Sequence, residues 1–145
     1  MSNREVEFYI VDMFIAYDKI KRYSKKFINA QDFLHSELEW DAVIRELEII
    51  GEATNQLLKA NMLNKEYRII VDFRNQITHG YFGVDENIVW EVVNNYLDEF
   101  RLELLNMIKS NSIDIQESIK FAKIDNNYSE KTTILLNNLY DEVKK

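Results

Sequence analysis

Residues 85–108 read DENIVWEVVNNYLDEFRLELLNMI, and apolar side chains recur there at steps of three and four. This spacing predicts one α-helix with a continuous apolar face, and the carboxylate of Asp85 can cap its first turn. The predicted core positions are Ile88, Val89, Val92, Val93, Tyr96, Leu97, Phe100, Leu104 and Ile108. A helix of this kind is stable only when its apolar face packs against other elements.

Two earlier helices show the same periodicity. The first ends near Tyr23, and a single turn with Phe27 and Phe33 follows it. Ser36 stands three residues before Glu39, the spacing at which each side chain can satisfy a helix-start amide of the other. The two apolar stripes comprise Val6, Ile10, Met13, Phe14, Tyr17 and Ile20, then Trp40, Val43, Ile44, Leu47, Ile50, Thr54, Leu57 and Leu58.

A third helix is predicted after Asn64, which can cap it, and Gly80 can end it in a left-handed conformation. Its face carries Tyr67, Ile70, Val71, Arg74 and Ile77. Beyond Ser110 the pattern loosens. A short helix around Ile115, Ile119 and 121–122, a polar break at 125–127, and a last helix from Ser129 with Ile134, Leu135, Leu139 and Val143 are expected.

The composition agrees with a helical domain. The 145 residues are 46% hydrophobic and 30% charged, and they include three Gly and no Pro. Few turn-forming residues and short connections predict an all-α fold, an up-and-down antiparallel bundle of four to five main helices. We expect residues 1–110 to form this bundle and residues 111–145 to form a C-terminal helical extension packed on the same domain.

Several classes of protein are disfavoured. The absence of Cys excludes disulfides and thiolate metal sites and agrees with a cytoplasmic location. Residues 8–15 are mostly apolar, but acidic residues lie among and before them, and the stretch is too short to span a membrane. We therefore expect no membrane partner. The acidic residues are scattered as on helix surfaces, so no metal site or cofactor is predicted.

Residues 74–81, RNQITHGY, combine a permanent cation, an imidazole and a phenol. A guanidinium can hold a phosphate, an imidazole can move protons near neutral pH, and neither group requires a metal. On a helix, His79 lies about 140° around the axis from Arg74, so the two do not share a face. Asn75 shares the face of His79, and its amide can hydrogen-bond and orient the imidazole.

The pattern R-N-x-x-x-H-x-Y is followed by Phe82-Gly83-Val84-Asp85 and Ile88-Val89-Trp90, and residues 45–53 read RELEIIGEA. Together these stretches resemble the HepT branch of the HEPN superfamily of small helical ribonucleases. Gly51 and Ala53 would let another helix approach closely. Glu52 could support the site by orienting Arg74 or His79, although a solvent-facing glutamate is the commoner case.

The resemblance implies a HEPN-like homodimer in which paired R-x-x-x-x-H motifs form a metal-independent site that cleaves tRNA or mRNA. Arg74 and His79 would be catalytic, with Asn75 supporting. The resemblance also implies a type VII-like toxin-antitoxin module. In that system an MntA-like nucleotidyltransferase transfers AMP to the motif tyrosine, Tyr81 here, and so silences the ribonuclease.

The net charge of −7 is unusual for a protein that binds RNA. The basic run at 19–26 could follow an RNA backbone, but cations at a helix end are more often solvated. His35 has no partner at catalytic spacing and is predicted to be a linker or surface residue. The alternative is a noncatalytic nucleotide-binding or assembly partner of a nucleotidyltransferase. The sequence leaves open whether the tail covers the bundle, builds an oligomer or binds an antitoxin.

Overall fold

The structure is a computed structural model that describes residues 3–79 and 83–144, and every regular element in those ranges is helical. The all-α, HEPN-like bundle is thereby confirmed. The elements are α1 (Asn3–Ser24), α2 (Ala30–Leu34), α3 (Glu37–Lys59), the 3₁₀ turn η1 (Lys65–Tyr67), α4 (Arg68–His79), α5 (Glu86–Glu91), the π turn η2 (Val92–Tyr96), α6 (Leu97–Ser110), α7 (Gln116–Asp125) and α8 (Glu130–Val143).

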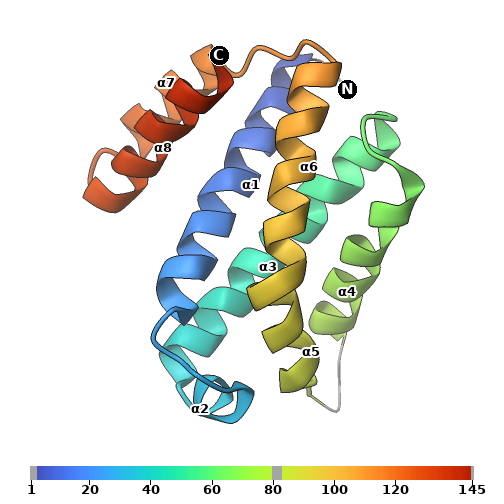
Figure 1. Cartoon of the computed structure of the whole chain (residues 1–145), viewed down its shortest axis with the longest axis vertical. Helices are drawn as coiled ribbons and strands as arrows, with labels where there is room; N and C mark the ends of the chain where they lie inside the picture. Colours follow the sequence, from blue (N-terminus) through green and yellow to red (C-terminus); the bar gives the residue numbers. More distant parts are fainter. Residues whose placement is uncertain (1–2, 80–82, 145) are drawn as a thin grey trace.

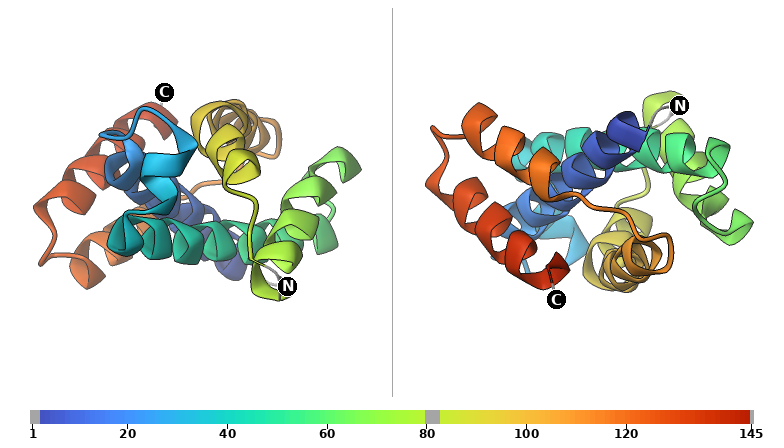
Figure 2. Two further views of the ribbon diagram at one scale, coloured as in Figure 1. Left: turned by 90° about the horizontal axis from the view of Figure 1, so that it is seen from below. Right: turned by 90° about the horizontal axis from the view of Figure 1, so that it is seen from above.

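The main helices run alternately up and down. Figure 1 shows α1 descending, α3 returning upward, α4 descending again and the α5–η2–α6 rod rising beside them. The hairpin of α7 and α8 lies on the opposite side of the bundle from α4, as both views in Figure 2 show. The most extensive helix interface joins α1 to α3, and α4 packs chiefly on α3. As a result, α4 is an outer helix of the bundle.

One apolar core links the helices. Its members come from α1, α2, α3, α4, the α5–α6 rod, α7 and α8. The ring of Phe33 is fully buried, and its centroid lies 5.3 Å from that of Phe27, 5.0 Å from that of Trp40 and 6.2 Å from that of Trp90. These rings close the end of the bundle where α2 lies. The short segment expected from the sequence is α2, and its buried Phe33 covers this end of the core.

The predicted stripes agree with the buried faces except at two positions. Ile88, predicted as a core position, is 47% exposed, and Ile134, on the apolar pattern of the last helix, is 52% exposed. A helix can turn only part of its circumference inward. Val89 occupies that part in α5, and Leu136 and Leu139 occupy it in α8. Ile88 instead lines an open groove between α4 and α5.

The long helix predicted over 85–108 is interrupted by η2, where the backbone makes a π turn. An inserted residue of this kind disturbs the regular hydrogen-bond ladder of an α-helix. The carbonyl of Val93 accepts a hydrogen bond from Lys21 Nζ at 3.1 Å, which satisfies a polar group at the irregular turn. The apolar spacing predicts a helix here but does not reveal the π turn within it.

The expected helix starts are partly confirmed. Asp85 accepts from the amide of Asn87 at 2.9 Å, and Ser129 accepts from the amide of Thr132 at 3.2 Å. Ser36 is the N-cap of α3, but its hydroxyl donates to the Glu39 carboxylate at 2.5 Å and caps no amide. The side chain of Asn64 likewise forms no cap, and η1 precedes α4. The expected helix end at Gly80 lies outside the described residues.

The tail covers the bundle. Ile115, Ile119, Leu136 and Leu139 are fully buried, and α7 and α8 pack against α1, with α8 also touching α6. Arg101 of the rod forms a two-pronged ion pair with Glu142 of α8, at 2.7 and 3.3 Å. Of the three roles left open for the tail, packing on the bundle is the one observed. The domain boundary at residue 110 stays a prediction. None of the described helices has both the length and the apolar character needed to cross a membrane.

Candidate functional site

Arg74 projects from α4 at a close contact between α4 and α3. A Cβ atom built on Gly51 would lie 2.3 Å from Arg74 Cβ and 2.5 Å from Arg74 Cγ. Real Cβ atoms do not approach other atoms so closely, so any larger residue at 51 would push α3 and α4 apart. The expectation that Gly51 permits close helix packing is confirmed, and the stem of Arg74 occupies the space.

The guanidinium of Arg74 is held by Glu52. Arg74 Nη2 lies 2.8 Å from Glu52 Oε2, and the two side chains are 22% and 50% exposed, respectively. Glu52 also accepts from Gln56 at 3.1 Å. The Nε atom of Arg74 is buried and has no hydrogen-bond partner among the described residues. Because Nε cannot be reached from solvent, only the terminal nitrogens of Arg74 are available to a ligand.

His79 is the last residue of α4 and is exposed. Asn75 is half-buried one turn earlier, but no hydrogen bond joins it to His79 within residues 3–79 and 83–144. A shared helix face brings two side chains near each other without forcing a bond, and the supporting role of Asn75 stays a prediction. Tyr81 lies outside the described residues.

Arg74 and His79 are presented differently within one chain. Arg74 points at α3 and its ion pair with Glu52, whereas His79 stands at the exposed end of α4. The structure brings Arg74 and Glu52 together and joins neither of them to His79 by a polar contact among the described residues. This agrees with the 140° offset expected from the helix geometry.

The basic run at 19–26 is largely neutralised. Lys21 pairs with Asp98 at 3.3 Å, Arg22 with Asp18 at 2.8 Å and Lys26 with Glu39 at 2.7 Å. The hydrogen bond from Lys26, then that from Ser36, lowers the pKa of Glu39 to about 2. Cations committed to neighbouring acids contribute less to RNA binding, so the interpretation of this run as ordinary helix-surface charge is favoured.

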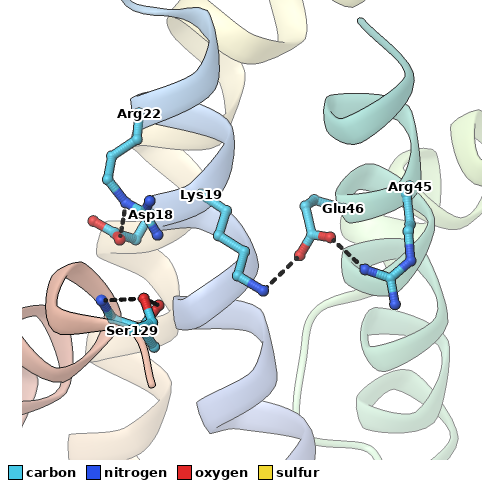
Figure 3. A network of polar contacts seen from close by, with 7 residues as sticks. Asp18, Lys19, Arg22, Arg45, Glu46 and Ser129 are labelled. Carbon is cyan, nitrogen blue, oxygen red and sulfur yellow. Dashed lines mark hydrogen bonds and ion pairs between the residues drawn. The ribbon is translucent and has the colours of Figure 1, made fainter. Parts of the chain in front are cut away.

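One buried charge was missed by the sequence analysis. Glu46 is 3% exposed and faces Lys19 of α1 at 4.0 Å and Arg45 at 3.2 Å, as Figure 3 shows. A signal for it was available. Glu46 comes three residues after Val43 and four before Ile50, which places it on the apolar face of α3. Its carboxylate ties α3 to α1 and lies away from the groups on α4.

No cluster of three or more His, Asp or Glu side chains suited to a metal ion occurs in the part of the chain that the structure describes. The other histidine, His35, is exposed at the C-cap of α2. The candidate site therefore consists of Arg74 and the exposed His79 of α4, with Glu52 of α3 as the partner of Arg74. A guanidinium that can bind a phosphate and an imidazole that can transfer a proton are the groups that chemistry at a phosphate requires, although one chain does not bring them together.

Comparison with known protein families matches residues 13–107 to the family described as "Ribonuclease HepT-like". The chain belongs to this family. The matched range of this HepT-like protein includes Glu52, Arg74, Asn75 and His79, and it ends before α7 and α8. The family resemblance drawn from the sequence motifs is confirmed.

Relatives of this HepT-like chain are named as ribonucleases. "Putative RNase MJ1380" of Methanocaldococcus jannaschii is 30% identical over 107 residues, covering 72% of this chain and 97% of the relative. "Probable ribonuclease HepT" of Thermococcus cleftensis is 35% identical over 88 residues, covering 59% of this chain and 79% of the relative. No solved structure matches the chain significantly.

Proposed function

We propose that this HepT-like protein is a metal-independent endoribonuclease in which Arg74 and His79 carry the chemistry. The observation that carries the proposal is the placement of both groups on α4 in a chain of a ribonuclease family, with Arg74 oriented by Glu52 and His79 exposed. tRNA and mRNA are the proposed substrates. The pairing of the basic run leaves the site on α4 as the favoured contact with a phosphate.

The proposed reaction is attack of a ribose 2′-oxygen on the adjacent phosphorus. The new 2′-O–P bond forms as the P–O5′ bond breaks, which leaves a 2′,3′-cyclic phosphate and a 5′-hydroxyl. His79 removes the proton of the 2′-hydroxyl, and a protonated imidazole supplies the proton that the 5′-oxygen needs. The terminal nitrogens of Arg74 stabilise the charge that builds on the phosphoryl oxygens.

Glu52 is proposed to position Arg74 without blocking it. A partly exposed ion pair of this kind contributes roughly 0.2–1 kcal/mol, because solvent screens it. A phosphate that accepts two parallel, charge-assisted hydrogen bonds from the guanidinium can bind it more strongly than this carboxylate does. The guanidinium can therefore turn from the carboxylate to the substrate at little cost, while Gly51 keeps its stem in place.

A homodimer is part of the proposal. The reaction needs one proton acceptor and one proton donor, and each chain supplies a single histidine to the site. Two-fold symmetry would bring His79 of both copies to one cleft, so that one imidazole acts as base and the other as acid. Arg74 and His79 do not meet within one chain, but Arg74 of one copy could then lie near His79 of the other across the interface.

Regulation by a partner enzyme is proposed as well. A cognate MntA-like nucleotidyltransferase in a type VII-like toxin-antitoxin module would transfer AMP to the Tyr81 hydroxyl. The added nucleotide would bring bulk and negative charge two residues after His79, where a substrate phosphate has to approach. The cytoplasm is the proposed place of action. Mass spectrometry after incubation with ATP and the partner checks the modification, and an unchanged mass under conditions where the partner is active would count against it.

The nuclease proposal is tested with purified protein, total tRNA and EDTA. We expect 2′,3′-cyclic phosphate ends, their loss in His79→Ala and Arg74→Ala, and their retention in His35→Ala. The last variant removes the other exposed histidine and is a matched control. Products that need added metal, or equal cleavage by His79→Ala, would refute the mechanism.

A second function is supported by the acidic surface. A net charge of −7 and a paired basic run favour a noncatalytic protein that binds a nucleotide or assembles with a nucleotidyltransferase. In that case the tRNA assay yields no products from the native protein. Calorimetric titration with AMP would then give binding that Arg74→Ala abolishes.

A further inference from the structure

A groove runs between α4 and the α5–η2 segment. Its volume is about 260 Å³, and its floor is formed by the buried side chains of Leu47, Ile50, Ile70 and Leu97. The walls are Ile69, Phe73 and Gln76 of α4 on one side and Ile88, Val92 and Tyr96 of α5–η2 on the other. Asp72 completes the lining.

The walls of this α4–α5 groove are apolar yet open to solvent. Ile69 is 57% exposed and Ile88 is 47% exposed. Ile69 and Phe73 are one helical turn apart on α4, and Ile88, Val92 and Tyr96 follow one another at four-residue steps. Two parallel rows of apolar side chains at helical spacing match the face of a third helix. The π turn η2 forms part of one wall, and such turns recur at functional sites.

The chain does not cover this groove with its own described elements. The C-terminal hairpin packs on α1 and α6, on the side of the bundle opposite α4 (Figure 2). The packing of α4 is chiefly against α3, through the face that carries Arg74. Its other face, with Ile69 and Phe73, is therefore available to a partner.

Acidic side chains lie on or next to both walls of the groove. Burial, followed by the charges of Glu66 and Glu99, raises the pKa of Tyr96 on one wall. Glu91 and Glu99 line a second, shallower pocket next to the α5–η2 wall. Asp72 lies on the opposite wall, which α4 forms. The nearby cation Arg68 is 4.0 Å from Asp72, which already offsets it. The rim is therefore negative around an apolar floor.

We propose that the α4–α5 groove docks an amphipathic helix of a partner protein whose apolar face is flanked by Lys and Arg. The apolar anchors would fill the groove, and the basic flanks would meet Asp72, Glu91 and Glu99. An RNA strand is disfavoured because its phosphates would meet the same carboxylates. A second copy of this chain is disfavoured because two-fold contact would set the acidic rim against itself. Small polar ligands are disfavoured because the lining offers few polar groups, namely Asp72, Gln76 and the hydroxyl of Tyr96.

The docked helix would contact the same helix that carries Arg74 and His79, but on a different face. Ile69 and Phe73 face the groove, whereas Arg74 faces Gly51 of α3. A partner anchored in this groove is therefore held beside the candidate site without occupying it. The inference does not require the proposed nuclease activity, because it depends on the shape and charge of the groove alone.

The test uses the full chain and a fluorescently labelled amphipathic peptide with leucines at helical spacing and lysines on both flanks. A second peptide replaces every lysine with glutamate. We expect fluorescence anisotropy to show binding of the lysine peptide and none of the glutamate peptide. Ile69→Ser and Ile88→Ser should each weaken binding about tenfold or more, as loss of an apolar anchor does. Glu99→Lys should weaken it as well.

Ile134→Ser is the matched control, because Ile134 is 52% exposed on α8 and lies away from the groove. It should leave binding unchanged, as should His79→Ala. Equal binding of both peptides, or no binding of either, would overturn the proposal. Conversion of a dimer to a monomer by Ile69→Ser and Ile88→Ser in light scattering would assign the groove to a second copy instead. A raised KM for RNA in these variants, without peptide binding, would assign it to the substrate.

Discussion

Gly51 of α3 and Arg74 of α4 are in such close contact that a methyl group on Gly51 would lie 2.3 Å from Arg74 Cβ. This contact sets the separation of the two helices. It also fixes where the Arg74 side chain begins, and Gly51 directly precedes Glu52, whose carboxylate binds the guanidinium of Arg74. The helix packing and the orientation of the candidate catalytic cation therefore depend on the same position.

The first prediction concerns Gly51→Ala. Alanine in a helix interior is normally more stable than glycine by about 0.5–1 kcal/mol. Here the added methyl group overlaps Arg74, and overpacking of this kind costs roughly 1–3 kcal/mol. We expect a net decrease in the free energy of unfolding in urea and lower RNA cleavage. Asp41→Ala, an exposed change on the same helix, should alter neither, and a stabilised Gly51→Ala protein would contradict the packing.

The second prediction separates positioning from stability at Glu52. Glu52→Gln removes the charge beside Arg74, and because the pair is partly exposed the stability should change by less than about 1 kcal/mol. If Glu52 orients Arg74 for charge stabilisation, kcat for RNA cleavage should fall about tenfold while KM changes little. Steady-state cleavage kinetics measure the two constants. Glu48→Gln on the same helix is the control, and an unchanged kcat in Glu52→Gln would remove Glu52 from the site.

The third prediction concerns the buried carboxylate of Glu46. Lys19→Met removes the partner of Glu46 on α1 and leaves the buried carboxylate paired with Arg45 alone. A buried polar group that loses a partner costs roughly 1–3 kcal/mol, and the remaining pair places the expected loss at the lower end of that range. In the double variant Lys19→Met with Glu46→Leu no charge is left unpaired, so part of the lost stability should return. Urea unfolding of the wild type, both single variants and the double variant gives the coupling. Additive losses would show that Lys19 and Glu46 do not interact.

The fourth prediction is a pH dependence at Glu39. The hydrogen bonds from Lys26 and Ser36 lower the pKa of this carboxyl from 4.5 to about 2. A folded pKa below the unfolded one stabilises the protein above pH 4.5, and this contribution is lost as the pH falls towards 2. NMR titration should report the low value in the wild type and one nearer 4.5 in Lys26→Met. A wild-type pKa near 4.5 would show that the ion pair does not form in solution.

Local pattern was sufficient to predict most of the helices. The apolar repeats located α1, α3, α4, the α5–α6 rod and α8, because a periodicity of three and four residues directly reports one buried helix face. The caps at Asp85 and Ser129 were also predictable, since they depend on residues two or three positions away. The π turn η2 was not predictable from local pattern. The carbonyl of Val93 within it accepts a hydrogen bond from Lys21, which lies on another helix far away in the sequence.

By itself, the sequence determined the all-α class, the family and the identity of the candidate residues Arg74 and His79, because these depend on short-range spacing. Only the tertiary structure decided that Arg74 pairs with Glu52 across two helices, that Asn75 does not bond His79, and that Ile88 lines an open groove. Each of those outcomes depends on how α4 is seated against its neighbours. That seating is set by contacts between residues far apart in the chain, such as Gly51 and Arg74, which no local pattern records.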